Sequence, residues 1–128
     1  MRLRSDDGYL DIEYRHTVGH MRAIALSALV KNEGGFLAGE NSNTFCSSSR
    51  SLVDDFTQFE THEIKELQID LDTGCHLRLT REDLGAVTVR YRVTYGEFPR
   101  DHALIGLAFI NGDMAIAQLS ELRRILIG

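Results

Sequence analysis

The sequence of 128 residues has little of what marks several specialised classes of protein: one proline, two cysteines, no tryptophan, and only 14 basic against 19 acidic residues. The cysteines, Cys46 and Cys75, form no CxxC motif and could pair only if the fold brought them together, so we expect two reduced thiols. The longest apolar run, residues 23–30, is much shorter than the roughly 20 residues that cross a bilayer. A net charge of -5 argues against nucleic-acid and membrane partners, since both require a basic face.

The organisation of the chain predicts a single domain over residues 1–128. No internal repeat, low-complexity tract or linker is visible, and Pro99 lies in a turn between two apolar runs. A chain of this length can bury a core without disulfides or metals. The N-terminal segment is charged and has no apolar core of a secretory signal, so we expect a cytoplasmic protein.

Alternation of apolar and polar residues predicts most of the strands. A hairpin is expected over residues 3–14 around Asp6-Asp7-Gly8, followed by a strand over residues 24–30 and another that begins at Phe36. The polar segment from Asn41 to Ser51 predicts a loop. The clearest β pattern is a meander, and one more apolar strand follows it; these four runs cover residues 67–71, 77–79, 87–95 and 104–110.

Two segments have the spacing of amphipathic helices. In the first, the apolar stripe includes Phe56 and Phe59, Ser51 and Asp54 match a capping box, and Ser48 or Ser49 are alternative caps. Asp54 and Asp55 are expected in its first turn, and its end near residues 61–62. The second helix is expected to begin at the N-cap Asp113, with Arg123 and Arg124 in its last turns.

The predicted order of elements is therefore β-β-β-β-α-β-β-β-β-α. This order indicates an α+β fold, an antiparallel sheet of about seven or eight strands with two helices packed against it.

No residue pattern indicates catalysis, a metal or a cofactor. His16 and His20 are four residues apart, but the Val18-Gly19 pair between them predicts a turn rather than a helical ligand pair. Cys75 and His76 are neighbours in a predicted strand, so their side chains point to opposite faces. The serine run 47–49 has no GxSxG context, and the glycines match no nucleotide-binding pattern. We expect a protein that is not an enzyme.

The negative charge is concentrated between residues 54 and 72, where seven acidic residues and one lysine give a net charge of -6. One interpretation is a solvated helix face and strand face. The other is an acidic patch that steers a basic protein partner, because complementary charge raises association rates. On an outer strand face, Arg90 and Arg92 are expected to pair with Asp70 and Asp72. The candidate protein-binding residues are Asp54, Asp55, Glu60, Glu63 and Glu66.

The layout of these elements resembles that of small bacterial immunity-like proteins, including the immunity partners of wall-associated contact-dependent toxins (WapI-type). The segments that carry the resemblance are the opening hairpin at residues 3–12, the helix that includes 52–56, the meander at 77–89 and the closing helix at 119–126. The resemblance implies a non-enzymatic cytoplasmic protein that binds and blocks a toxin, often a nuclease. Two alternatives stay open: a homo-oligomeric interaction protein that uses an exposed sheet edge or face, and a small-molecule-binding protein with a site in the concave face of the sheet.

Overall fold

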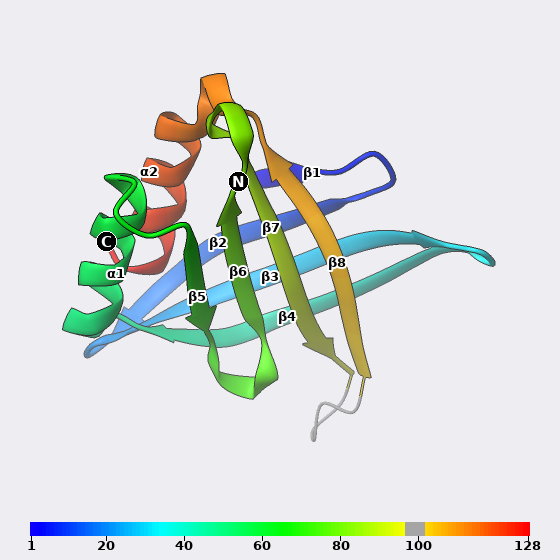
Figure 1. Ribbon diagram of the computed structural model, residues 1–128. Coiled ribbons are helices and arrows are strands. Elements are labelled where there is room, and N and C mark those ends of the chain that lie inside the picture. Colours follow the sequence, from blue (N-terminus) through cyan, green and yellow to red (C-terminus); the bar gives the residue numbers. More distant parts are fainter. Residues whose placement is uncertain (97–101) are drawn as a thin grey trace.

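A computed structural model describes residues 1–96 and 102–128 and contains an eight-stranded antiparallel sheet with two helices (Figure 1). The α+β prediction and the predicted order of eight strands and two helices are confirmed. The turn predicted around Pro99 lies outside the described residues. The elements are β1 (Arg2–Arg4), β2 (Tyr9–Val18), β3 (Met21–Asn32), β4 (Gly35–Ser47), α1 (Arg50–Glu60), β5 (Glu66–Asp70), η1 (Asp72–Gly74), β6 (His76–Arg81), η2 (Asp83–Gly85), β7 (Val87–Tyr95), β8 (His102–Ile110), η3 (Gly112–Met114) and α2 (Ala115–Leu126).

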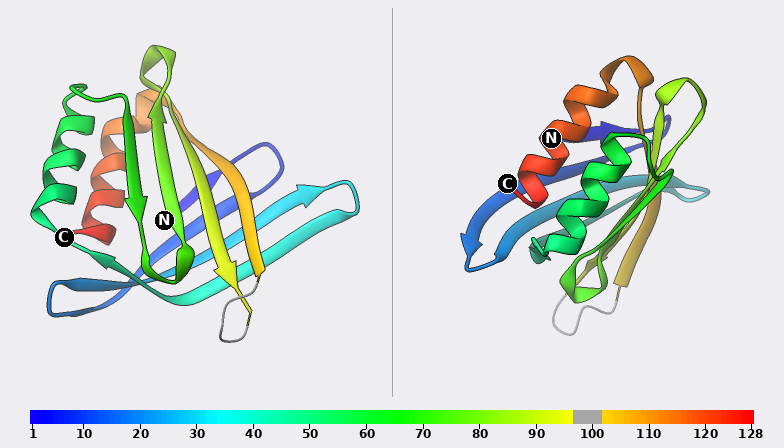
Figure 2. Two further views of the ribbon diagram at one scale, coloured as in Figure 1. Left: turned by 60° about the horizontal axis from the view of Figure 1, so that its bottom comes forward. Right: turned by 60° about the vertical axis from the view of Figure 1, so that its left-hand side comes forward.

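The sheet has the strand order β4-β3-β2-β1-β8-β7-β6-β5, so β1 joins an N-terminal half to a C-terminal half. The pairing at this junction is short, because β1 and β8 share only the residue pair Arg4–Phe109. The sheet also folds back on itself, because β4 contacts β7 and β8 although it stands at the far end of the strand order. Figures 1 and 2 show the long β3–β4 hairpin crossing the β7–β8 pair.

Both helices pack on one face of the sheet and enclose a single hydrophobic cluster (Figure 2). The expected core residues Phe56 and Phe59 of α1 are fully buried. Arg123, in the last turn of α2 as predicted, forms an ion pair with Glu60 and also donates a hydrogen bond to Thr57 of α1. This contact holds the two helices together at their exposed side.

The prediction of a loop over Asn41 to Ser51 is wrong for residues 41–47, which continue β4 and pair with β3. The physical reason is a partly buried polar cluster that takes up two buried polar side chains of this strand, those of Asn41 and Thr44. The Nδ2 of Asn41 lies 3.1 Å from the Thr73 hydroxyl, 3.5 Å from the Cys75 sulfur and 3.3 Å from the Thr94 hydroxyl. We call Asn41, Thr44, Asp72, Thr73, Cys75 and Thr94 the polar cluster.

The predicted helix starts also need correction. The helix α1 begins at Arg50, and its N-cap is Ser49, whose hydroxyl accepts a hydrogen bond from the Leu52 N–H at 3.1 Å. The capping box from Ser51 to Asp54 is wrong, because both residues are already inside the helix, and Asp54 and Asp55 lie beyond its first turn. Asp113 does not cap α2 either: it belongs to η3, and the N-cap position is Met114.

Candidate functional site

The five predicted binding residues do not form one unpaired acidic patch. Asp54 and Asp55 are exposed on α1 with no ion pair among the described residues, and Glu63 is exposed in the loop before β5. Glu60 pairs with Arg123, and Glu66 pairs with Arg78 at 2.8 Å. Two of the five carboxylates are therefore neutralised by neighbouring arginines.

The expected pairing of Arg90 and Arg92 with Asp70 and Asp72 is also wrong. Strand β6 separates β5 from β7, so Arg92 stands opposite His76 and Arg90 opposite Arg78. Asp72 instead accepts hydrogen bonds from the Thr44 hydroxyl at 2.8 Å and the Phe45 N–H at 2.5 Å. Its carboxylate holds β4 against the β5–β6 turn.

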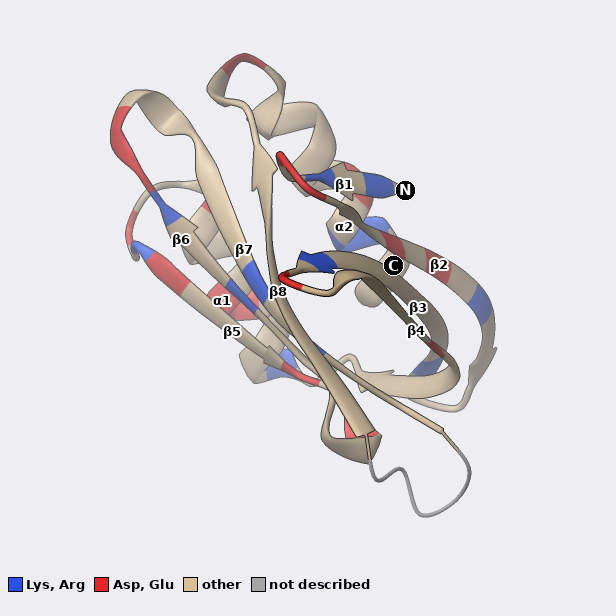
Figure 3. Cartoon of the chain, turned by 90° about the vertical axis from the view of Figure 1, so that its right-hand side faces the viewer, with Lys and Arg blue, Asp and Glu red and all other residues tan. Residues whose placement is uncertain are grey.

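Exposed apolar and acidic side chains occur together at one end of the molecule, where η2 and η3 contact each other. Figure 3 shows acidic segments in both turns at this end. The side chain of Leu84 is 98% exposed, that of Ile116 89% and that of Met114 49%. Three acidic residues beside them form no ion pair among the described residues: Glu82, Asp83 and Asp113. We call this set the apical surface; it consists of Glu82, Asp83, Leu84, Asp113, Met114 and Ile116.

Leu84 has a left-handed backbone conformation, which is unusual for a leucine. Leu84 (φ 61°) and Gly85 (φ 79°) are both left-handed, as are Thr73 (φ 60°) and Gly74 (φ 82°) in the other short hairpin turn. Two successive left-handed residues are typical of type I′ turns, which favour Asn, Asp or Gly at the first position because a bulkier side chain is strained there. Thr73 compensates through its contacts in the polar cluster. Leu84 is solvent-exposed, so the fold gains nothing visible from its side chain.

The turn that carries Leu84 is held firmly against η3. A Cβ atom on Gly112 would lie 2.3 Å from the Leu84 carbonyl oxygen, so only glycine allows the two turns to approach so closely. The leucine is therefore displayed on a supported backbone rather than on a free loop.

A cavity of about 240 Å³ adjoins the apical surface and is lined by Glu60, His62, Arg81, Ala115, Ile116 and Leu119. Arg81 donates from Nη2 to the Phe59 carbonyl at 2.8 Å, and its guanidinium stacks on the Phe59 ring. Burial lowers the pKa of Arg81, and its Nε has no hydrogen-bond partner in the described part of the chain. The cavity thus has a cationic wall and an apolar wall beside the exposed Ile116.

Possible metal ligands and thiols occur across residues 1–96 and 102–128. No three His, Cys, Asp or Glu side chains there come close enough to hold a metal ion. Both cysteines are free and buried, and burial raises the pKa of the Cys46 thiol to about 11. A thiol with such a pKa is protonated at neutral pH and is a poor nucleophile.

Comparison of the chain with protein-family models, curated proteins and solved structures finds no match. No helix within the described ranges is long and apolar enough to cross a membrane.

The predicted strands at 77–79 and 87–95 leave a connection that includes residues 81–85, but the sequence did not predict the apical surface. The available signal was the Asp83-Leu84-Gly85 triplet, which puts a leucine where a tight turn favours Asn or Asp. The contact between this triplet and residues 112–116 depends on the tertiary structure, which local sequence does not show.

Proposed function

We propose that this protein is a non-enzymatic, cytoplasmic protein-binding module that docks a basic protein partner on its apical surface. The observation that carries the proposal is Leu84, an exposed leucine in a strained, well-supported turn. Backbone strain and exposed apolar side chains that do not serve the fold are concentrated at functional sites.

The surroundings of Leu84 support a partner with positive charge. Leu84, Met114 and Ile116 provide apolar contact area, and Glu82, Asp83 and Asp113 surround them with negative charge. Interfaces commonly combine an apolar centre with a charged rim that guides association. A toxin domain such as a nuclease, as the resemblance to immunity-like proteins implies, has this chemistry, and the protein would then act by blocking it.

The test compares wild-type protein with Leu84→Asn and Ile116→Lys as baits in extract of the source organism. Proteins enriched by the wild type over both variants are purified, and their affinities are measured by calorimetry. We expect the variants to bind a basic partner about tenfold or more weakly, which is typical of an interface hot spot. If no protein is enriched over the variants, or if affinities are equal, the proposal is wrong.

Stability measurements separate a binding role for Leu84 from a structural one. Because Asn tolerates the left-handed conformation, Leu84→Asn should raise the free energy of unfolding by up to about 1 kcal/mol while it weakens binding. The matched control is Thr73→Asn at the equivalent turn position, which should lower stability and leave binding unchanged. A Leu84→Asn protein that is less stable than wild type would indicate that the leucine serves the fold.

A second pair of variants decides where the acidic patch lies. Asp83→Asn with Asp113→Asn removes two apical charges, and Asp54→Asn with Asp55→Asn removes two from α1. We expect only the apical pair to lower the association rate and its dependence on salt concentration. The opposite result would place the patch on α1, as the sequence alone suggested.

A further inference from the structure

The strand β8 has an open edge in the middle of the sheet. It pairs with β7 from His102 to Ile110, but on its other side β1 reaches it only at Phe109. The segment 103–108 therefore has no strand on that side among the described residues. In an antiparallel strand, alternate residues direct their N–H and C=O groups to opposite sides, so about half of these groups face the opening.

This edge lacks the protection that the outer edges of the sheet have. Strand β5 is only five residues long and carries Glu66 and Asp70, and β4 carries Glu40 and several polar residues. The open segment of β8 reads Ala-Leu-Ile-Gly-Leu-Ala, without charge or proline, and Ile105 within it is 73% exposed. Unprotected apolar edges readily accept another strand, and proteins usually avoid them.

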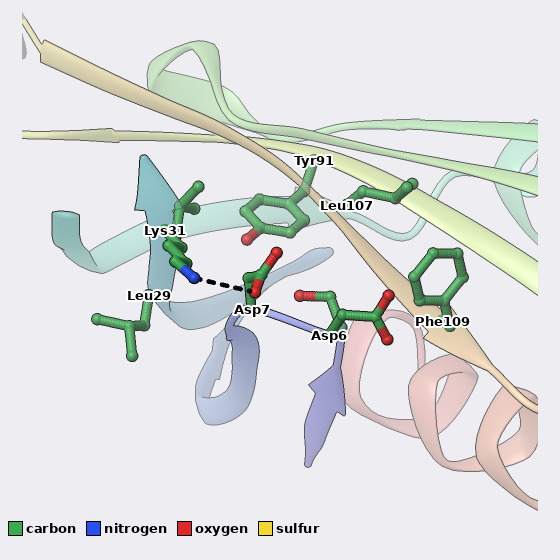
Figure 4. A pocket seen from close by; sticks show the side chains of 9 residues that line it. Asp6, Asp7, Leu29, Lys31, Tyr91, Leu107 and Phe109 are labelled. Carbon is green, nitrogen blue, oxygen red and sulfur yellow. Dashed lines mark ion pairs between the residues drawn. The ribbon is translucent and has the colours of Figure 1, made fainter. Parts of the chain in front are cut away.

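A cavity of about 260 Å³ lies beside the open edge (Figure 4). Leu107 and Phe109 of β8 form one wall, and β3 and the β1–β2 turn contribute the others. The ring of Tyr91 crosses Gly106, where a Cβ atom would lie 2.3 Å from the tyrosine hydroxyl oxygen, and the ring reaches the cavity. The remaining lining residues are Ser5, Asp6, Asp7, Leu29, Val30 and Lys31.

The charges in this cavity leave one carboxylate unpaired. Lys31 lies 3.9 Å from Asp7, whereas Asp6 has no ion pair or hydrogen bond to the described residues. In Figure 4 the Asp6 side chain lies between Asp7 and Phe109. A cationic group that entered beside Phe109 would meet the free carboxylate.

We propose that the open edge of β8 binds an extended segment of a partner protein, which adds to the sheet as a strand in the space beyond the end of β1. A row of unpaired N–H and C=O groups is matched by another extended main chain, and alternate side chains then give specificity. The segment carries apolar residues beside Ile105 and Leu107, and a lysine or arginine that reaches Asp6. This site is separate from the apical surface and does not rest on the function proposed for it.

The probe for this site is a phage-displayed library of random ten-residue linear peptides, selected on the full-length protein. Selected peptides are synthesised and their dissociation constants measured by fluorescence anisotropy. We expect alternating peptides with a basic residue, bound at least tenfold more weakly by Ile105→Lys and by Asp6→Asn. The matched control, Ile116→Lys, makes the same change at an exposed apical isoleucine and should bind them normally.

N-methylated peptides test main-chain pairing directly. Methyl groups on one set of alternate amides should abolish binding, whereas the other set should have little effect, because only one set faces β8. Failure to select any peptide, equal binding to Ile105→Lys, or equal effects of the two methylation sets would overturn the proposal. The proposal would also be overturned if sedimentation showed that the wild-type protein is a dimer and that Ile105→Lys is a monomer. A second copy of the chain, rather than a partner protein, would then occupy the edge. None of these results bears on Leu84 and the apical partner, so the two proposals fail separately.

Discussion

At the scale of single residues, the surroundings of a carboxylate determine what it contributes to the stability of the fold. Asp11 stands opposite Arg2 on the β1–β2 pair and accepts two hydrogen bonds from its guanidinium, at 2.7 and 2.8 Å. These hydrogen bonds lower the pKa of Asp11 below its ordinary value of 3.8. Asp54 has the same carboxylate but no such partner. Asp11 therefore links folding to pH.

The stability of the Asp11→Asn variant should depend on pH in a defined direction. The lowered pKa of Asp11 means that its ion pair stabilises the fold above the unfolded pKa, and that this contribution disappears as pH falls through the folded pKa. Urea unfolding should therefore show a small loss of stability in Asp11→Asn at pH 7, and no difference from wild type well below about pH 4. Asp54→Asn, at an exposed position with no ion pair among the described residues, is the control and should leave the stability at pH 7 close to that of wild type. A loss that does not shrink as the pH falls below about 4 would mean that packing, not charge, is responsible.

At the scale of elements, the polar cluster determines the course of β4. The strand contains Gly39, Asn41, Ser42 and Asn43, which are poor strand residues, yet it pairs with β3 on both sides of a register irregularity at Ser42 and Asn43. Its buried polar side chains bond to the β5–β6 turn and to β7, so the hydrogen bonds lost to water are replaced. The cluster thereby ties the N-terminal half of the sheet to the C-terminal half.

Removing the centre of this cluster should be costly. Asn41→Ala leaves the buried Thr94 and Cys75 without the amide that lies between them, and we expect it to lower the free energy of unfolding by about 1–3 kcal/mol. Asn43→Ala makes the same substitution at an exposed position of the same strand and should have a much smaller effect. Chemical denaturation of the two variants compares them. Equal losses would show that strand propensity, rather than the cluster, stabilises β4.

At the scale of the whole molecule, the hydrophobic cluster extends through both halves of the sheet and both helices. Cys46 of β4 and Cys75 of the β5–β6 turn are buried in it on opposite sides of the β1–β8 junction. The two thiols therefore lie in different halves of the strand order. A single domain requires that both halves unfold together.

The thiols should become reactive in one transition. Because both are buried and burial raises the Cys46 pKa to about 11, we expect no reaction with a thiol reagent in the native protein. Each thiol is followed in a variant that lacks the other: Cys75 in Cys46→Ala, and Cys46 in Cys75→Ala. As the urea concentration rises, each thiol should begin to react at the unfolding midpoint that circular dichroism gives for the same variant. Reaction of one thiol well before its variant's circular dichroism changes would divide the chain into two cooperative units.

The sequence by itself determined the class of fold, because alternation within strands and the stripe of Phe56 and Phe59 are local consequences of which side faces a core. It also located the excess of acidic residues. Only the tertiary structure decided that Asn41 is buried in a strand, that Glu60 and Glu66 are paired, and that Leu84 and the β8 edge are exposed. Each of these depends on which distant segments meet, and local residue patterns carry no information about that. The net charge of -5 noted at the outset argues against nucleic acid as a partner. The position of the proposed binding surface depends on how the turns η2 and η3 come together.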